Sequence, residues 1–88
     1  MNYAIEKAFQ KDFRNLKNKN LANDIIEAIN NVQKANSISE IKNIKKLTGY
    51  KSAYRIRCGT YRIGITIEDN IITFVAFDHR KDIYKKFP

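Results

Sequence analysis

The segment from residue 53 to residue 77 constrains the fold most, because it holds three strand-like stretches joined by very short connections. The stretches are Ala53 to Cys58, Tyr61 to Ile67 and Ile71 to Phe77. Gly59-Thr60 separates the first pair and Glu68-Asp69-Asn70 the second. Connections this short join antiparallel neighbours. We therefore expect a three-stranded antiparallel meander.

The third stretch and the N-terminus indicate how the sheet is extended. Residues 71–77 are apolar on both faces except at Thr73, which is typical of a strand inside a sheet rather than at its edge. Tyr3 and Ile5 alternate with Ala4, so a short edge strand is expected near the N-terminus.

Two apolar stripes with helical spacing precede the meander. The first consists of Phe9, Phe13 and Leu16, and the second of Leu21, Ile25, Ala28, Ile29 and Val32. Each stripe repeats at intervals of three and four residues, which predicts an amphipathic helix. The polar break Asn18-Lys19-Asn20 lies between them, so the two helices are expected to form a hairpin.

Shorter helical turns are expected on either side of the meander. Residues 37–40 open a connector with room for one helical turn before Leu47, and residues 80–87 suit a helical extension. The predicted fold is α+β: an N-terminal helical hairpin packed on one face of a small antiparallel sheet, in the order β-α-α-β-β-β with a C-terminal helical extension. At 88 residues, the chain (1–88) is expected to be one small domain.

Arginines gather on one side of the predicted meander. Arg55 and Arg57 alternate with apolar residues in its first strand, and Arg62 does so in the second. Alternate side chains of a strand share a face, so three guanidinium groups are expected on one side of the hairpin. The residues that follow the last strand include His79, Arg80 and Tyr84. Together these residues predict a polyanion site with a titratable group at its rim.

The net charge supports a partner that carries negative charge. The chain has 17 Lys and Arg against 9 Asp and Glu, a formal charge of +8. Residues 45–88 hold ten of the basic residues and only four of the acidic ones. Such an uneven excess is typical of proteins that bind nucleic acid, an anionic membrane or an acidic protein.

Other classes of site and location are excluded or disfavoured by composition. Cys58 is the only cysteine and falls on the apolar face of its strand, so no disulfide framework or metal cluster is expected, and core filler is the simplest interpretation. No cofactor is expected. An apolar run of about 18 residues is absent, as is the apolar core of a signal peptide. We expect a cytoplasmic protein that does not enter the membrane.

These residues, in this order, resemble the RelE/ParE toxins of bacterial toxin–antitoxin systems, on the RelE-like branch. The resemblance spans the chain, but its specific part is confined to residues 47–84. It consists of Leu47-Thr48-Gly49-Tyr50, Tyr54-Arg55-Ile56-Arg57, Gly59-Thr60-Tyr61-Arg62-Ile63 and His79-Arg80 with Asp82-Ile83-Tyr84.

The resemblance implies an activity and partners. RelE-type toxins enter the ribosomal A site and cut mRNA without a metal, by attack of a ribose 2′-OH on the adjacent phosphodiester. ParE-type toxins share the fold and poison DNA gyrase. Both kinds are held inactive by an antitoxin, which here is expected to be acidic, and DNA is expected to be contacted only through the toxin–antitoxin complex.

The resemblance also implies a role for each basic residue. Arg62 matches the strand arginine of the family and is expected to hold the scissile phosphate, since a guanidinium can bind two non-bridging oxygens at once. Arg55, Arg57 and Lys51 are expected to bind the RNA backbone. The alternative is that these side chains bind no ligand and simply form a solvated basic face of the sheet.

Three residues near the C-terminus complete the expected site. His79 matches a histidine that some relatives use as general acid, and a histidine can exchange a proton near neutral pH. Arg80 is the alternative cation for that position. Tyr84 matches a tyrosine that stacks on the substrate base; its structural alternative is an aromatic that pins the C-terminal segment to the sheet. The general base remains unassigned, because the strand positions hold arginine where some relatives place a carboxylate or histidine.

Three other functions remain open on sequence alone. They are a ParE-like gyrase inhibitor, a passive nucleic-acid-binding module, and a toxin that has lost activity but still binds its antitoxin and operator.

Overall fold

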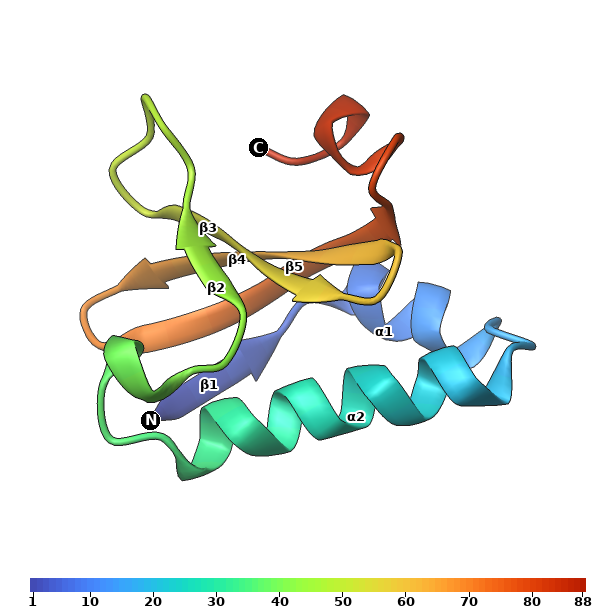
Figure 1. Ribbon diagram of the computed structural model, residues 1–88, viewed down its shortest axis with the longest axis horizontal. Helices are drawn as coiled ribbons and strands as arrows, with labels where there is room; N and C mark the ends of the chain where they lie inside the picture. Colours follow the sequence, from blue (N-terminus) through green and yellow to red (C-terminus); the bar gives the residue numbers. More distant parts are fainter.

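The computed structural model describes all residues from 1 to 88 and shows an α+β fold (Figure 1), with a five-stranded sheet. The strands are β1 (Asn2–Ile5), β2 (Ile44–Lys46), β3 (Ala53–Cys58), β4 (Tyr61–Glu68) and β5 (Ile71–His79). The helices are α1 (Lys7–Arg14) and α2 (Lys19–Lys34), and the short 3₁₀ turns are η1 (Ile38–Glu40) and η2 (Ile83–Lys85). The predicted fold class is confirmed, as are both short helical turns.

The strand order β1-β5-β4-β3-β2 confirms the antiparallel meander of β3, β4 and β5 and places β5 inside the sheet. Two features differ from the sequence prediction. The sheet is mixed, because the edge strand β1 runs parallel to β5, and β2 is an additional strand that pairs with β3. No short turn fixes the direction of β1, since the helices carry the chain away from it. With two lysines in three residues, β2 has no apolar alternation to reveal it.

A β-bulge interrupts the pairing of β4 with β5. Gly64 pairs with Ala76 and Ile65 with Phe74, so Val75 is one extra residue in β5. An extra residue reverses the alternation of side chains beyond it. The residues of β5 after Val75 therefore face the opposite side from the one that uninterrupted alternation would give them.

The helices cover one face of the sheet (Figure 1). The Asn18 side chain caps α2 by accepting a hydrogen bond from the Leu21 amide at 3.1 Å, which explains why the polar break starts a helix there. Phe9 of α1 is buried between two rings of β5, Phe74 and Phe77, at centroid distances of 5.8 and 5.0 Å. This face carries the larger hydrophobic core.

A second, smaller core lies on the other face of the sheet. It consists of Ala53, Ala76, Ile83 and Phe87. The C-terminal segment folds back over the sheet on the side away from the helices (Figure 1), and the Phe87 ring lies directly on Gly64, where even a Cβ atom would overlap it. The segment is thus held by Ile83 and Phe87, both of which are buried.

The helices of the structure have a further common property. None of them combines the length and apolar character that a membrane-spanning helix requires.

The contact between Gly64 and Phe87 predicts a strongly coupled pair. Gly64→Ala should lower the free energy of unfolding by about 1–3 kcal/mol, the usual cost of overpacking a core. In a Phe87→Ala background the ring is gone, so the added methyl should cost much less. Urea unfolding of the wild type, both single variants and the double variant measures this coupling. Equal costs of Gly64→Ala in both backgrounds would show that the segment does not pack on Gly64.

Candidate functional site

The register of β3 and β4 places three arginines on the face of the sheet away from the helices. Arg57 pairs directly with Arg62, and Arg55 pairs with Gly64. Residues paired across two strands share a face, so the predicted grouping of these side chains is confirmed.

An open depression of about 520 Å³ lies on this face. Its lining residues are Lys45, Lys46, Leu47, Thr48, Arg55, Arg62, Arg80, Lys81 and Tyr84. Six of these nine residues are basic and none is acidic. We call it the basic depression. The loop that follows β2 and the C-terminal segment rise on this side of the sheet (Figure 1), and both contribute lining residues.

Arg62 is held in place by the backbone rather than by an acid. Its Nη1 atom donates hydrogen bonds to the carbonyl oxygens of Gly59 at 2.9 Å and Tyr61 at 2.8 Å. In each of the three ion pairs of the structure, the cation is a lysine. No arginine of the cluster therefore has a carboxylate partner, and the remaining guanidinium nitrogens can bind an anion.

The electrostatics of Arg62 show how closely the cations are grouped. The pKa of Arg62 is lowered from its ordinary value, first by burial and then by repulsion from Arg55, Arg57 and, more weakly, Arg80, while Tyr84 acts in the opposite direction. The group stays charged, because arginine does not lose its proton in proteins. An anion in the depression would relieve this repulsion.

The C-terminal segment brings two more side chains to the depression. The backbone amide of Arg80 donates to the Thr60 carbonyl oxygen at 2.8 Å, beside the β3–β4 turn. Tyr84 follows the buried Ile83 directly and is itself 55% exposed. The segment is thus anchored by Ile83 while the Tyr84 ring remains free for a ligand.

His79 lies apart from the arginines. It pairs with Tyr61, at a ring centroid distance of 5.7 Å, and this is the helix-facing side of the sheet. Its Nδ1 atom accepts a hydrogen bond from the Lys81 amide at 3.2 Å. Arg62 instead pairs with Asp78, whose carboxylate binds Lys86 at 3.3 Å. The bulge at Val75 is the physical reason, since it moves His79 to the opposite face from Arg62.

Two predicted RNA-binding residues lie at the margins of the depression. Arg57 is exposed next to Arg62 but lines a neighbouring groove. Lys51 belongs to the loop after β2 and lines a smaller hollow that shares residues with the depression. The structure therefore brings together Arg55, Arg62, Arg80 and Tyr84.

The sequence analysis did not single out several residues that the site uses. Lys45, Lys46 and Lys81 line the depression. The only sequence signal for them is local basic charge, which does not give a direction. Ile83 and Phe87, four residues apart, do form a helical apolar pair that could have predicted the anchor.

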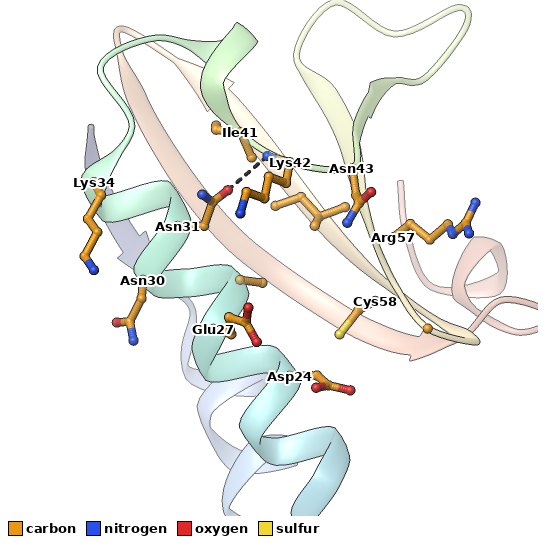
Figure 2. Close-up of a pocket in the computed structure, with 13 residues that line it drawn as sticks. Asp24, Glu27, Asn30, Asn31, Lys34, Ile41, Lys42, Asn43, Arg57 and Cys58 are labelled. Carbon is orange, nitrogen blue, oxygen red and sulfur yellow. Dashed lines mark hydrogen bonds between the residues drawn. The ribbon is translucent and has the colours of Figure 1, made fainter.

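A larger cavity of about 600 Å³ lies between α2 and β3 (Figure 2). Its lining includes both acidic and basic residues, among them Asp24, Glu27 and Lys42. Cys58 lies at this groove, and burial raises the pKa of its thiol, with smaller contributions from Asp24 and Glu27. A thiol with a raised pKa is a poor nucleophile. Because its lining carries both signs of charge, the groove also lacks the concentrated positive charge of the basic depression, despite its larger volume.

No cluster of metal ligands was found in the structure. Nowhere do three or more His, Cys, Asp or Glu side chains come together in a way that could hold a metal ion.

Comparison with known proteins gives consistent matches over the whole chain. The model of a family described as "ParE toxin of type II toxin-antitoxin system, parDE" matches residues 3–84. The protein Toxin RelE3 of Methanocaldococcus jannaschii is 39% identical over 89 residues, covering all of both chains.

Solved structures show the same fold. A chain of the RelB-RelE antitoxin–toxin complex from Methanococcus jannaschii is similar with a TM-score of 0.76 and 38% identity, covering 97% of this chain and 99% of that one. An archaeal RelE-RelB complex from Pyrococcus horikoshii OT3 contains a chain with a TM-score of 0.71 and 23% identity, covering 90% and 93%. The latter likeness concerns the fold alone.

The direct pairing of Arg57 with Arg62 predicts that the site reduces the stability of the fold. Like charges opposite each other in a sheet are destabilising by about 0.2–1 kcal/mol. Arg57→Thr should therefore raise the free energy of unfolding by about that amount at low salt. At 1 M salt, where the screening length is about 3 Å, most of the gain should disappear.

The measurement is urea unfolding of wild type and variant at both salt concentrations. Arg57→Lys keeps the charge and is the matched control, which should show no gain. A gain that persists unchanged in 1 M salt would contradict the electrostatic explanation and point to the strand propensity of threonine.

Proposed function

Because the chain belongs to the RelE/ParE family of toxins of type II toxin–antitoxin systems, we propose that it is an endoribonuclease that cleaves mRNA on the ribosome. The proposed site is the basic depression. The observation that carries the proposal is the absence of acidic residues among its nine lining residues, six of which are basic. A cluster of unpaired guanidinium groups is suited to phosphate.

In the proposed reaction the ribose 2′ oxygen attacks the adjacent phosphorus, and the bond from phosphorus to the 5′ oxygen of the next nucleotide breaks. The products are a 2′,3′-cyclic phosphate and a 5′-OH end. The nucleophile comes from the RNA itself, so the protein has to stabilise the additional negative charge of the transition state. Arg62, fixed by two backbone carbonyls, is proposed to bind the non-bridging oxygens, with Arg55 and Arg80 beside it.

The remaining lining residues support binding and proton transfer. The exposed Tyr84 ring is proposed to stack on the base next to the scissile phosphate, an interaction worth about 1–3 kcal/mol. Proton transfer to and from the RNA oxygens needs a group that can exchange a proton. Lysine ammonium groups and the Tyr84 hydroxyl have that chemistry in the depression, whereas His79 lies on the other face of the sheet.

The proposed partners follow from the family and from the charge. The Methanococcus jannaschii relative was solved as a complex of RelB with RelE. We propose that this chain also forms a complex with an antitoxin, whose acidic segment covers the arginine face and inhibits it, and that the free protein acts in the cytoplasm, where ribosomes translate mRNA. DNA would be bound through the antitoxin.

The matched family model is named for ParE, so gyrase is the alternative target. The clustering of Arg62, Arg80 and Tyr84 around one depression favours RNA chemistry, because a pure protein-binding surface needs no such convergence.

Loss of the phosphate clamp should abolish most cleavage. Arg62→Ala should lower the rate of mRNA cleavage by about 100- to 1000-fold, by analogy with the removal of a single oxyanion donor, with little change in ribosome binding. His79→Ala should reduce the rate by less than about 10-fold because its ring faces away from the site; a positioned general acid would contribute about 100- to 10,000-fold. Primer extension on mRNA from translating ribosomes, read for new 5′ ends, measures both.

A gyrase supercoiling assay with the same proteins separates the alternatives. Intact mRNA together with blocked gyrase would contradict the proposal and assign the protein to the ParE branch. A large loss with His79→Ala would contradict the proposed location of the site.

The arginine face should dominate RNA affinity. The double variant Arg55→Glu/Arg57→Glu should bind RNA far more weakly than wild type, because it reverses charge where the phosphates are proposed to lie. Its salt dependence should also be shallower, by about 0.7 log unit in affinity per log unit of salt for each lost phosphate contact.

The matched control is Lys11→Glu/Arg14→Glu, which makes the same change in net charge on α1, away from the depression. Both doubles are titrated with single-stranded RNA at several salt concentrations, and their folding is checked by thermal unfolding. Equal losses in the two variants would show that only net charge matters and would contradict the assignment of this face.

A further inference from the structure

The loop at residues 47–52, between β2 and β3, presents an aromatic ring that the fold does not use. Tyr50 is 51% exposed, and among the large apolar side chains only Tyr84 is more exposed, at 55%. Neither hydrophobic core includes Tyr50. A ring left in solvent at a fixed place is available to a ligand.

The backbone of the loop that carries this ring is held in place. The Leu47 amide donates to the Ala53 carbonyl oxygen at 2.9 Å and closes the loop, while the Leu47 side chain packs against the second core. Gly49, with φ of +88°, makes the tight turn before Tyr50. At the far end the Ser52 hydroxyl donates to Glu68 at 3.0 Å. The loop backbone is thus ordered before a ligand binds, so little backbone entropy is lost on binding.

The space beside Tyr50 is continuous with the basic depression. A second hollow, of about 470 Å³, is lined by Lys46, Leu47, Thr48, Gly49, Tyr50 and Lys51. The first three of these residues also line the basic depression. One continuous surface therefore runs from Tyr84 and the arginines to Tyr50.

The lining of the second hollow matches single-stranded nucleic acid. It contains two lysines and an exposed tyrosine and no acidic residue. A cation that tracks the backbone beside an aromatic ring that stacks on a base is the general recognition mode of single strands. The arrangement also repeats that of the basic depression, where Tyr84 accompanies Arg62 and Arg80.

From this continuity we propose that residues 46–51 form a second nucleotide subsite, in which Tyr50 stacks on the base of a neighbouring nucleotide and Lys51 binds its phosphate. The inference rests on the proposed RNA-cleaving function, because it extends the same strand. The protein then binds a segment of RNA through two aromatic rings, Tyr84 at the scissile position and Tyr50 at a flanking one. Base preference at the flanking position is set by stacking on Tyr50.

The test is a double-mutant cycle, in which the substitution of Tyr50 is combined with the removal of individual bases from the RNA. The probe is a fluorescein-labelled 2′-fluoro RNA tetranucleotide, which lacks the attacking 2′-OH, and four versions of it with one abasic site each. Fluorescence anisotropy at low salt gives the affinity of each probe. Wild type should lose affinity at two abasic positions, by about 5- to 100-fold at each.

Each tyrosine variant should then remove the effect of a different position. Tyr50→Ala should bind the intact probe about 5- to 100-fold more weakly and become insensitive to one abasic position, while Tyr84→Ala becomes insensitive to the other. Tyr50→Phe keeps the stacking face and should behave as wild type. Because Tyr50 is outside both cores, the thermal unfolding of Tyr50→Ala should be unchanged.

The outcomes separate this inference from the proposed function. A wild type sensitive to one abasic position only, with Tyr50→Ala binding normally, would overturn the second subsite and leave the proposed function in place. If the wild type had no measurable affinity for the intact probe, or if the Arg55→Glu/Arg57→Glu double variant bound it as tightly as the wild type, both would be overturned. Equal sensitivity of Tyr50→Ala and wild type to every abasic position would also overturn the subsite.

Discussion

Repulsion among arginines on one face of the sheet is the constraint on which the rest of the structure depends. Arg57 and Arg62 are directly paired, Arg55 and Arg80 lie close enough to affect Arg62, and none of the four forms an ion pair with a carboxylate. Such an arrangement does not stabilise the fold. It persists because the larger core, on the helix face, holds β3, β4 and β5 in register from the other side.

The second core decides which residues join the arginines. Ile83 and Phe87 hold the C-terminal segment on the sheet, and Gly64 is the position whose missing side chain makes room for the Phe87 ring. Arg80 and Tyr84 reach the depression only because that segment is docked. The same small apolar cluster therefore contributes to stability and completes the proposed site.

Much of this arrangement could be predicted from the sequence, because it follows from local periodicity. The short connections between strand-like stretches predicted the meander, and the two-residue alternation around Arg55 and Arg62 predicted the shared face of the arginines. The direction of β1 and the existence of β2 depend on contacts between distant segments, which periodicity does not reveal. The position of His79 depends on a single inserted residue, Val75. Because simple alternation would place His79 on the arginine face, only the observed register shows that it lies opposite.

The most direct test of the central claim is to observe the arginine side chains themselves when RNA binds. The chain has five arginines, of which Arg14 lies on α1 and serves as an internal reference. In ¹H–¹⁵N NMR spectra that resolve the arginine Nε–H groups, titration with the uncleavable RNA tetranucleotide should shift the signals of Arg55, Arg62 and Arg80 and leave that of Arg14 in place. Equal shifts at Arg14, or no shift at Arg62, would contradict the assignment of this face of the sheet as the RNA-binding site.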